Sequence, residues 1–293
     1  MNQRKIRYMI KKLLKQHIID TAQDNAVAVL LSGGVDSLSV ALAAHDVGKK
    51  VHPYTFYLDG EESYDAKTAR EFSDSMGWNC KTIVVPKTNL EDDWHRLVKH
   101  GCRKKTHFET VFPFLYVYPE ITEKCVLTGW GADGYFGVSK KAMMRYSNDR
   151  KKENYTRYCK EHNQKQLSFD EFRIDYLDGD CAGYKEHTRL AETYNKVHIA
   201  PYKDSMDIRN LLMSKNWQEL NKPRQKEIIR KDFTELEKYG NIKQHQNLHL
   251  NAGVDKLFES LLNNGEINFK NRKRMMDVCR DNYERNKNDL FAI

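Results

Sequence analysis

The chain has no run that approaches about 18 consecutive apolar residues, so no membrane-spanning helix is expected. Its basic first 20 residues mix charged and apolar side chains and lack the apolar block of a signal peptide. The six cysteines include no CxxC pair, which argues against a zinc or iron–sulfur site. Scattered free thiols are typical of a reducing compartment, and we therefore expect a cytoplasmic protein.

Composition and charge set broad limits on the function. The 293 residues are 40% apolar and 31% charged, which excludes a fully disordered chain, a collagen and a coiled-coil rod. The net charge of +8 favours polyanionic partners, namely nucleotides, nucleic acid or an acidic protein. Two basic runs, at 99–105 and 140–152, are interpreted as solvated loops, with contact to a polyanion as the alternative.

Strands and helices alternate in the first half of the chain. Short apolar runs predict buried strands at 26–31, 54–58, 81–85 and 124–128, with helical patterns between them. Pro53 should stand at the start of the second strand, because proline cannot donate within a central ladder. The alternation predicts an α/β fold with a parallel, doubly wound, Rossmann-like sheet and helices on both faces.

The strand signal ends near residue 145. Seven helical patterns follow, among them 184–197 and, near the end of the chain, 254–264 and 270–287. The predicted organisation is an N-terminal amphipathic helix within 1–24, a ligand-binding α/β domain over 25–145, and a helical substrate or cap region over 146–293.

The first of two glycine-rich turns carries the strongest functional signal. In Ser32-Gly33-Gly34-Val35-Asp36-Ser37, backbone N–H groups can converge on an anion at the positive end of the following helix. The turn lacks the lysine of a P-loop and the spacing of a dinucleotide-binding loop. Asp36 would repel a bare phosphate, so its presence favours a magnesium ion between carboxylate and phosphates. The alternative is a carboxylate that stabilises the helix N-terminus.

This turn resembles the SGGxDS pyrophosphate loop of the N-type ATP pyrophosphatases, the PP-loop superfamily. The second turn, TGWGADGYFG at 128–137, is similar to the SGEGxDExFGG turn of the asparagine synthetase family. Residues 200–204, 226–230 and 242–253 resemble three further segments of that family, so the resemblance covers roughly 26–264. It implies the synthetase domain, with its adenine nucleotide alpha hydrolase-like fold, and ATP and Mg²⁺ as cofactors.

The resemblance also assigns residues to the expected site. Asp36 and Asp133 would bind the magnesium ion, and Lys243, Lys226 and His245 are the expected catalytic residues. Lys226 begins the segment that resembles the family's K-x-xLR helix, and Lys243 and His245 lie in the segment that matches its catalytic lysine. The nucleotide would contact both turns and the second strand: Leu31, Ser32, Gly33, Gly34, Asp36, Ser37, Thr55, Phe56, Gly129 and Gly131.

The chain departs from the family where catalysis is concerned. Trp130 stands at the position of the family's catalytic glutamate, and an indole cannot accept a proton. Either another base replaces the glutamate, with Glu109, Asp204 and His245 as candidates, or the acceptor differs. The indole could stack on a planar substrate or fill the core. Position 2 is Asn2, not the cysteine nucleophile of a glutaminase, so we expect a separate donor of ammonia or an amine.

The resulting hypothesis is an ATP-dependent ligase that forms AMP and pyrophosphate. It would adenylate a carboxylate or carbonyl of a small molecule and transfer it to ammonia or an amine. Two alternatives stay open at this point. The loop and the positive charge also suit an enzyme that modifies a base in nucleic acid, although nucleic acid is not the favoured partner. The missing glutamate favours an inactive nucleotide-binding protein with a regulatory or interaction role.

Overall fold

A five-stranded parallel sheet forms the centre of the molecule. The structure, a computed structural model, describes residues 9–60, 62–103, 105–179 and 183–238, together with residues 253, 254 and 257. The strand order is β3-β2-β1-β4-β5, and every pair of neighbours is parallel. The strands are β1 (Ala26–Leu30), β2 (Lys50–Leu58), β3 (Lys81–Val85), β4 (Cys125–Leu127) and β5 (Val197–Ile199).

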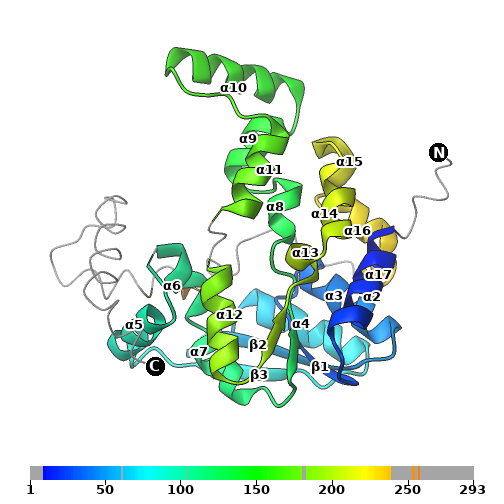
Figure 1. The fold of residues 1–293 in the computed structure, drawn as a ribbon, viewed down its shortest axis with the longest axis vertical. Helices are drawn as coiled ribbons and strands as arrows, with labels where there is room; N and C mark the ends of the chain where they lie inside the picture. Colours follow the sequence, from blue (N-terminus) through cyan, green and yellow to red (C-terminus); the bar gives the residue numbers. More distant parts are fainter. Residues whose placement is uncertain are drawn as a thin grey trace.

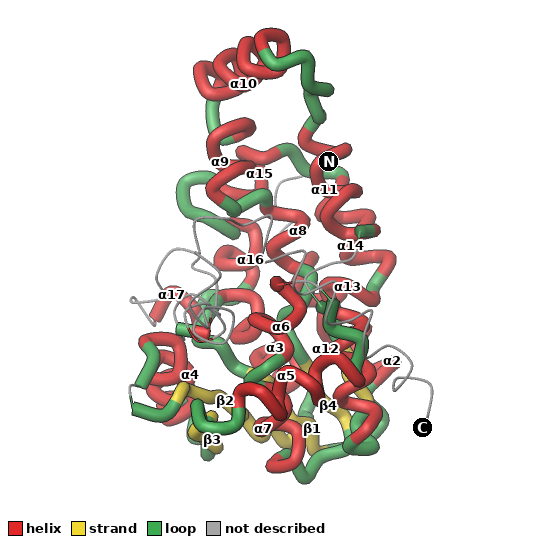
Figure 2. Tube along the Cα trace, turned by 90° about the vertical axis from the view of Figure 1, so that its left-hand side faces the viewer, coloured by secondary structure: helices red, strands yellow, loops and turns green. Residues whose placement is uncertain are grey.

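Helices cover both faces of this sheet (Figures 1 and 2). Successive residues of β1 enter two different buried clusters, Val27 and Val29 on one face and Ala28 and Leu30 on the other. The first cluster includes side chains of α2 (Met9–Thr21), α3 (Val35–Asp46), α4 (Tyr64–Ser75), α14 (Met206–Met213) and α16 (Glu227–Asp232). The second includes α5 (Leu90–Lys99), α6 (Lys105–Val111), α7 (Phe114–Val117) and α12 (Tyr184–Thr193). The predicted α/β fold is confirmed.

The structure describes eight further helices. They are η1 (Tyr118–Glu120), α8 (Ala132–Phe136), α9 (Lys140–Tyr146), α10 (Asp149–Glu161), α11 (Phe169–Asp178), α13 (Pro201–Asp204), α15 (Trp217–Asn221) and α17 (Glu235–Lys238). Within the part of the chain that the structure describes, no helix is long and apolar enough to cross a membrane.

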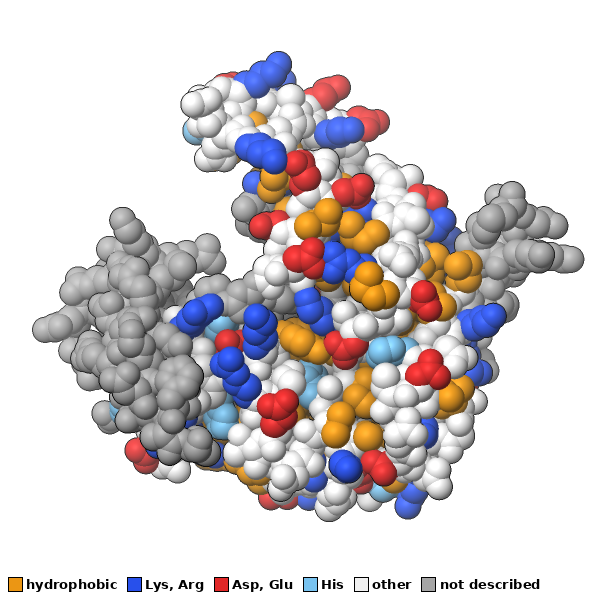
Figure 3. All heavy atoms as spheres, viewed as in Figure 1, with side chains coloured by type: hydrophobic (Ala, Val, Ile, Leu, Met, Phe, Trp, Pro, Cys, Tyr) orange, Lys and Arg blue, Asp and Glu red, His pale blue; other side chains and the backbone are white. Residues whose placement is uncertain are grey.

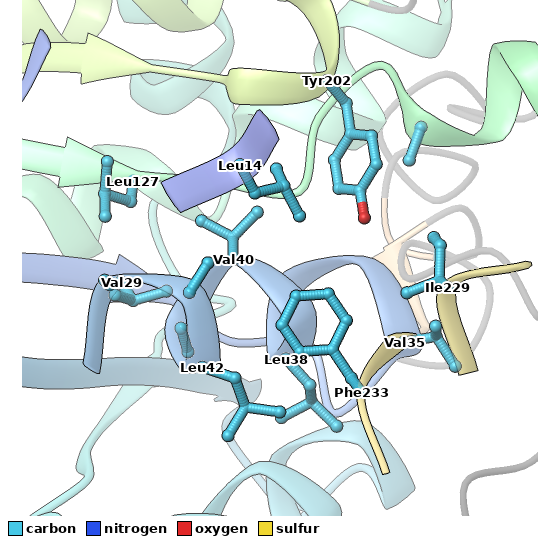
Figure 4. Close-up of a cluster of buried hydrophobic side chains, with 14 of the residues drawn as sticks. Leu14, Val29, Val35, Leu38, Val40, Leu42, Leu127, Tyr202, Ile229 and Phe233 are labelled. Atoms are coloured by element: carbon cyan, nitrogen blue, oxygen red, sulfur yellow. The ribbon is translucent and has the colours of Figure 1, made fainter. Parts of the chain in front are cut away.

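Helix α3 follows the first turn and is buried over most of its length. Its side chains from Val35 to Ala44 are buried apart from Asp36. Figure 4 shows Leu14 of α2 and Phe233 packed around this helix. Because the helix is enclosed on several sides, it holds the residues of its first turn in a fixed position relative to the sheet.

Pro53 lies in the middle of β2, not at its start as predicted from the sequence. The N–H of Leu31 donates to the carbonyl of Tyr54, so Tyr54 faces β1 and the neighbouring Pro53 faces β3. The β2–β3 ladder begins only at the pair Tyr54–Lys81. The missing N–H of the proline therefore points to where β3 has not yet begun, and no ladder hydrogen bond is lost.

The prediction that the second half is wholly helical was wrong at one element. Helix α12 ends at Thr193, and Val197–Ile199 form β5, which pairs with β4. A strand of three residues is too short for its alternation to be distinguished from the end of a helical pattern. The sheet thus draws its fifth strand from residues beyond 145.

The basic run 140–152 was also interpreted wrongly as a loop. Most of it forms α9 and the start of α10. Helical periodicity is hard to detect there because few of its side chains are apolar. The patterns at 254–264 and 270–287 lie almost wholly outside the described residues.

Candidate active site

The two glycine-rich turns lie side by side at the carboxyl ends of β1 and β4, which are neighbours in the sheet. The direction of strand order changes between these strands, and open α/β sheets bind ligands at such a point. A Cβ atom on Gly129 would lie 2.6 Å from the backbone N of Ser37 and 2.8 Å from the carbonyl carbon of Asp36. The turns therefore pack backbone against backbone, and only glycine fits at 129.

We expect Gly129→Ala to lower the free energy of unfolding by about 1–3 kcal/mol, because the added methyl group must push the turns apart. The same displacement should weaken ATP binding. Urea denaturation and calorimetric titration measure the two effects. Gly77→Ala is the control: its φ of +68° also disfavours a side chain, but the residue follows α4 and its Cβ would meet nothing within 4 Å. It should lower stability and leave ATP affinity unchanged. An unaltered stability of Gly129→Ala would contradict the close contact.

The first turn is shaped by its serines. The hydroxyls of Ser32 and Ser37 lie 3.1 Å apart, and the N–H of Ser32 donates to Ser37 Oγ at 3.2 Å. Gly33 has a φ of +68°, and a Cβ there would lie 2.8 Å from Thr68 Cβ in α4. The N–H of Gly34 reaches Ser32 Oγ only at 3.4 Å, so an anion bound at the turn would replace a weak bond.

Two carboxylates from the turns converge on one lysine. Asp36 lies in the first turn of α3 and Asp133 in the first turn of α8. The ammonium of Lys226 donates to Asp36 Oδ2 at 2.5 Å and to Asp133 Oδ1 at 2.6 Å. Three segments that are distant in the sequence thus meet at one group.

Lys226 is held in place from several sides. It precedes α16 in a left-handed conformation with φ +58°, its N–H donates to Asn221 Oδ1, and only 5% of the residue is exposed. Burial opposes its positive charge, but the charges of Asp133 and Asp36 outweigh that effect and raise its pKa. The lysine is therefore a permanent cation between the two carboxylates.

Asp36 and Asp133 fit the magnesium ion expected from the sequence as donors. Carboxylate oxygens are the ligands that magnesium prefers, and these two already point at a single cation. Within the described ranges, no group of three or more His, Cys, Asp or Glu side chains could hold a metal ion. A magnesium ion at this pair would therefore complete its coordination with water or phosphate oxygens.

A comparison of the sequence with known families identifies the family of this chain. The sequence model of asparagine synthase matches residues 9–252, which is most of the chain. The chain belongs to the asparagine synthase family. The resemblance of both turns is thereby confirmed, and an ATP-dependent, amide-forming synthetase-like role follows from the family. No curated protein matches the chain.

The family segment at 200–204 makes hydrogen bonds that connect the elements next to the site. The hydroxyl of Tyr202 lies 2.8 Å from Ser39 Oγ and so joins α13 to α3 in the interior. Asp204 Oδ2 accepts from the N–H of Ala200 at 2.7 Å, and its Oδ1 accepts from the hydroxyl of Tyr184 at 2.6 Å. Both oxygens of Asp204 are thus engaged in local structure, although Asp204 was a candidate base.

The other residues expected to contact the nucleotide lie just before α8, directly after β1 and within β2. Gly131 directly precedes α8, with φ +89°, beside Lys203. Leu31 is buried, and Thr55 and Phe56 are buried inside β2, which continues to Leu58. The ring of Phe56 packs edge-on against Phe114 in the core, with centroids 5.7 Å apart. Lys243 and His245 lie outside the described residues, and the roles of all these residues stay predictions.

Trp130 is half-buried and stacks on a histidine. Its ring and that of His187 have centroids 4.9 Å apart and planes 27° apart, and Tyr184 lies near the same indole at 6.4 Å. Burial, together with the neighbouring His198, holds the pKa of His187 well below its usual value, so its imidazole is neutral. An aromatic pair therefore lies at the position where the resemblance implies a catalytic glutamate. Another candidate base, Glu109, is buried on α6.

His198 of β5 is a site residue that the sequence analysis missed. Its Nε2 lies 3.0 Å from Thr128 Oγ1 and its Nδ1 3.0 Å from Thr188 Oγ1. Burial lowers its pKa to about 3, so the ring is neutral and can donate to one threonine while accepting from the other. It joins the second turn to α12. No local signal marks it, because β5 itself is not recognisable from the sequence.

Proposed function

We propose that this protein forms AMP and pyrophosphate from ATP while it makes an amide. A carboxylate or carbonyl oxygen of a small molecule attacks the α-phosphorus, the bond from that phosphorus to the bridging oxygen breaks, and pyrophosphate leaves with the electron pair. Ammonia or an amine then attacks the activated carbon, the carbon–oxygen bond breaks, and AMP departs. The observation that carries this proposal is the meeting of Asp36, Asp133 and Lys226 at the switch point of the sheet.

Charge neutralisation and positioning are the main requirements of phosphoryl chemistry of this kind. The N–H groups of the first turn and the positive end of α3 suit the phosphates of ATP. Lys226 would hold the leaving pyrophosphate, and a charge-assisted hydrogen bond of this kind contributes about 1.5–3 kcal/mol. Asp36 and Asp133 would hold magnesium, which when bound supplies further neutralisation of phosphate charge.

The remaining assignments rest on the family match in sequence. Lys243 and His245 belong to the proposed catalytic machinery on that ground alone. We assign ATP binding to 25–145 and the acceptor to 146–293. The acceptor must tolerate the indole of Trp130, whose one face is covered by His187.

The stack of Trp130 on His187 favours one second candidate function. Neither ring carries a carboxylate, and the neutral imidazole is fully buried. The second candidate is therefore a protein whose site has lost a group needed for catalysis and which binds ATP without turning it over.

We expect α-labelled ATP, incubated with the protein, magnesium, ammonium and pools of carboxylic acids or amines, to yield AMP and pyrophosphate in equal amounts. Thin-layer chromatography separates AMP from ADP, and a coupled assay measures pyrophosphate. The Asp133→Asn protein is the control for contaminating hydrolases. Formation of ADP would overturn the proposal. Saturable ATP binding without either product in any pool would support the second candidate instead.

A further inference from the structure

Helices α9, α10 and α11 form a projection, residues 138–179, which we name the arm. Figures 1 and 2 show α10 at the end of the molecule farthest from the sheet. The buried side chains of α10 are Tyr155 and Cys159, one turn apart, and this helix packs mainly on α9. Most of the surface of α10 therefore faces solvent.

The arm holds most of the surplus positive charge of the chain. Residues 139–168 contain nine lysine and arginine residues and three acidic ones. These 30 residues therefore carry +6 of the net +8 of the whole chain. Figure 3 shows basic side chains spread over this projection. A charge concentrated in this way creates a local field that attracts polyanions.

The basic side chains of α10 outnumber its acidic ones, five to three. Those of Arg150, Lys151, Lys152, Arg157 and Lys160 are exposed. None of them forms an ion pair with any side chain that the structure describes, whereas Lys165 nearby binds Glu171 at 2.8 Å. Their charged groups are therefore available to phosphates.

The arm has a small core of its own, which distinguishes it from a mobile charged loop. Tyr146 of α9 packs against three rings of α10 and α11, with centroids 5.2–6.2 Å apart: Tyr155, Phe169 and Phe172. The hydroxyl of Tyr146 donates to the carbonyl of Leu167 at 2.9 Å. The basic residues are thus displayed on an ordered helix.

The base of the arm is fixed beside the candidate active site. Arg173 of α11 is 1% exposed and donates to three carbonyls near the end of α14, at 2.9–3.1 Å: Leu212, Met213 and Lys215. A Cβ on Gly134 would lie 2.5 Å from the ring of Tyr176, so α11 packs tightly on the helix that carries Asp133. A ligand bound to the arm would therefore be attached to the helix packing that also positions the candidate active site.

We propose that the arm is a nucleic-acid-binding element that contacts the phosphate backbone. The one large apolar side chain exposed on α10 is Tyr158, which is 45% exposed and stacks on His162 with centroids 4.1 Å apart. A membrane-surface helix needs a continuous apolar face, and lysine is depleted in protein–protein interfaces. Basic side chains together with an exposed aromatic pair suit phosphates and bases.

The test measures binding of a fluorescein-labelled RNA hairpin, and of a DNA duplex of the same sequence, by anisotropy without ATP. The arm variant replaces Lys151, Lys152, Arg157 and Lys160 by glutamine. We expect it to weaken binding at least about tenfold and to lower the slope of log K against log salt by about 3–4, because each lost phosphate contact contributes about 0.9 on a duplex. The matched control replaces Lys12, Lys50, Lys81 and Lys124, which are exposed on α2 and at the starts of strands.

The control removes the same charge and should change affinity by less than about threefold. Circular dichroism verifies the fold of both variants, and photo-crosslinking of thiouridine-labelled RNA to the wild-type chain should mark peptides within 139–168. A preference for the RNA hairpin or for the DNA duplex shows which nucleic acid the arm binds. The proposal is overturned if the wild-type protein binds neither, if both variants weaken binding equally, or if the arm binds anionic vesicles or polyglutamate in preference to nucleic acid. Asp133→Asn should bind RNA like the wild type, so this result is independent of the ATP chemistry.

Discussion

Replacement of Asp133 by asparagine is expected to reduce magnesium-dependent turnover of ATP by on the order of 10²–10³-fold. The substitution keeps the size of the side chain and removes its negative charge. Asp133 shares the ammonium of Lys226 with Asp36, so its charge lies between the two turns that we propose bind the phosphates. The rate of pyrophosphate release at saturating ATP and magnesium measures the effect.

Asp46→Asn is a suitable control for this substitution. Asp46 ends α3, at the opposite end of the helix from Asp36, and binds Lys11 at 2.9 Å. Loss of such a partly exposed pair costs about 0–1 kcal/mol and should leave turnover unchanged. A rate for Asp133→Asn equal to that of Asp46→Asn would reject the proposed role of Asp133 in holding the metal.

The parts of the fold that were predictable are those with local causes. The apolar run of β1, the glycines after it and the helical pattern of α3 follow one another within residues 26–46, so each could be predicted from its neighbours. The break between α6 and α7 has a local cause of the same kind, because Pro113 directly precedes α7.

The parts that were not predictable depend on distant residues. Pro53 is tolerated inside β2 because of where β3 begins, and β5 is a strand only because β4 lies beside it. Lys226 was expected to be catalytic from a short motif, but its contacts with Asp36 and Asp133 span 190 and 93 residues. The stack of Trp130 on His187 also depends on distant residues, because the whole arm separates α12 from the second turn in the sequence.

Lys226→Met should make the stability of the protein depend on divalent ions. The substitution removes the ammonium that Asp36 and Asp133 share. We expect the free energy of unfolding in EDTA to fall by about 3 kcal/mol, the lower end for a broken buried pair, because the Asp133 side chain is 37% exposed and partly screened by water. Magnesium should restore much of this loss, since a ligand at 100 times its dissociation constant stabilises by about 2.7 kcal/mol.

Urea denaturation at constant ionic strength, with and without magnesium, measures both effects. The wild-type protein should respond little to magnesium without ATP, because the ammonium already lies between the two carboxylates and offsets one of their two negative charges. The double variant Lys226→Met/Asp133→Asn removes the repulsion as well as the cation, so it should be more stable in EDTA than Lys226→Met and gain less from magnesium. If Lys226→Met equals the wild type in EDTA, the ammonium of Lys226 does not stabilise the two carboxylates. If it loses stability but magnesium restores none of it, the carboxylates form an ion pair with the lysine but do not bind the metal.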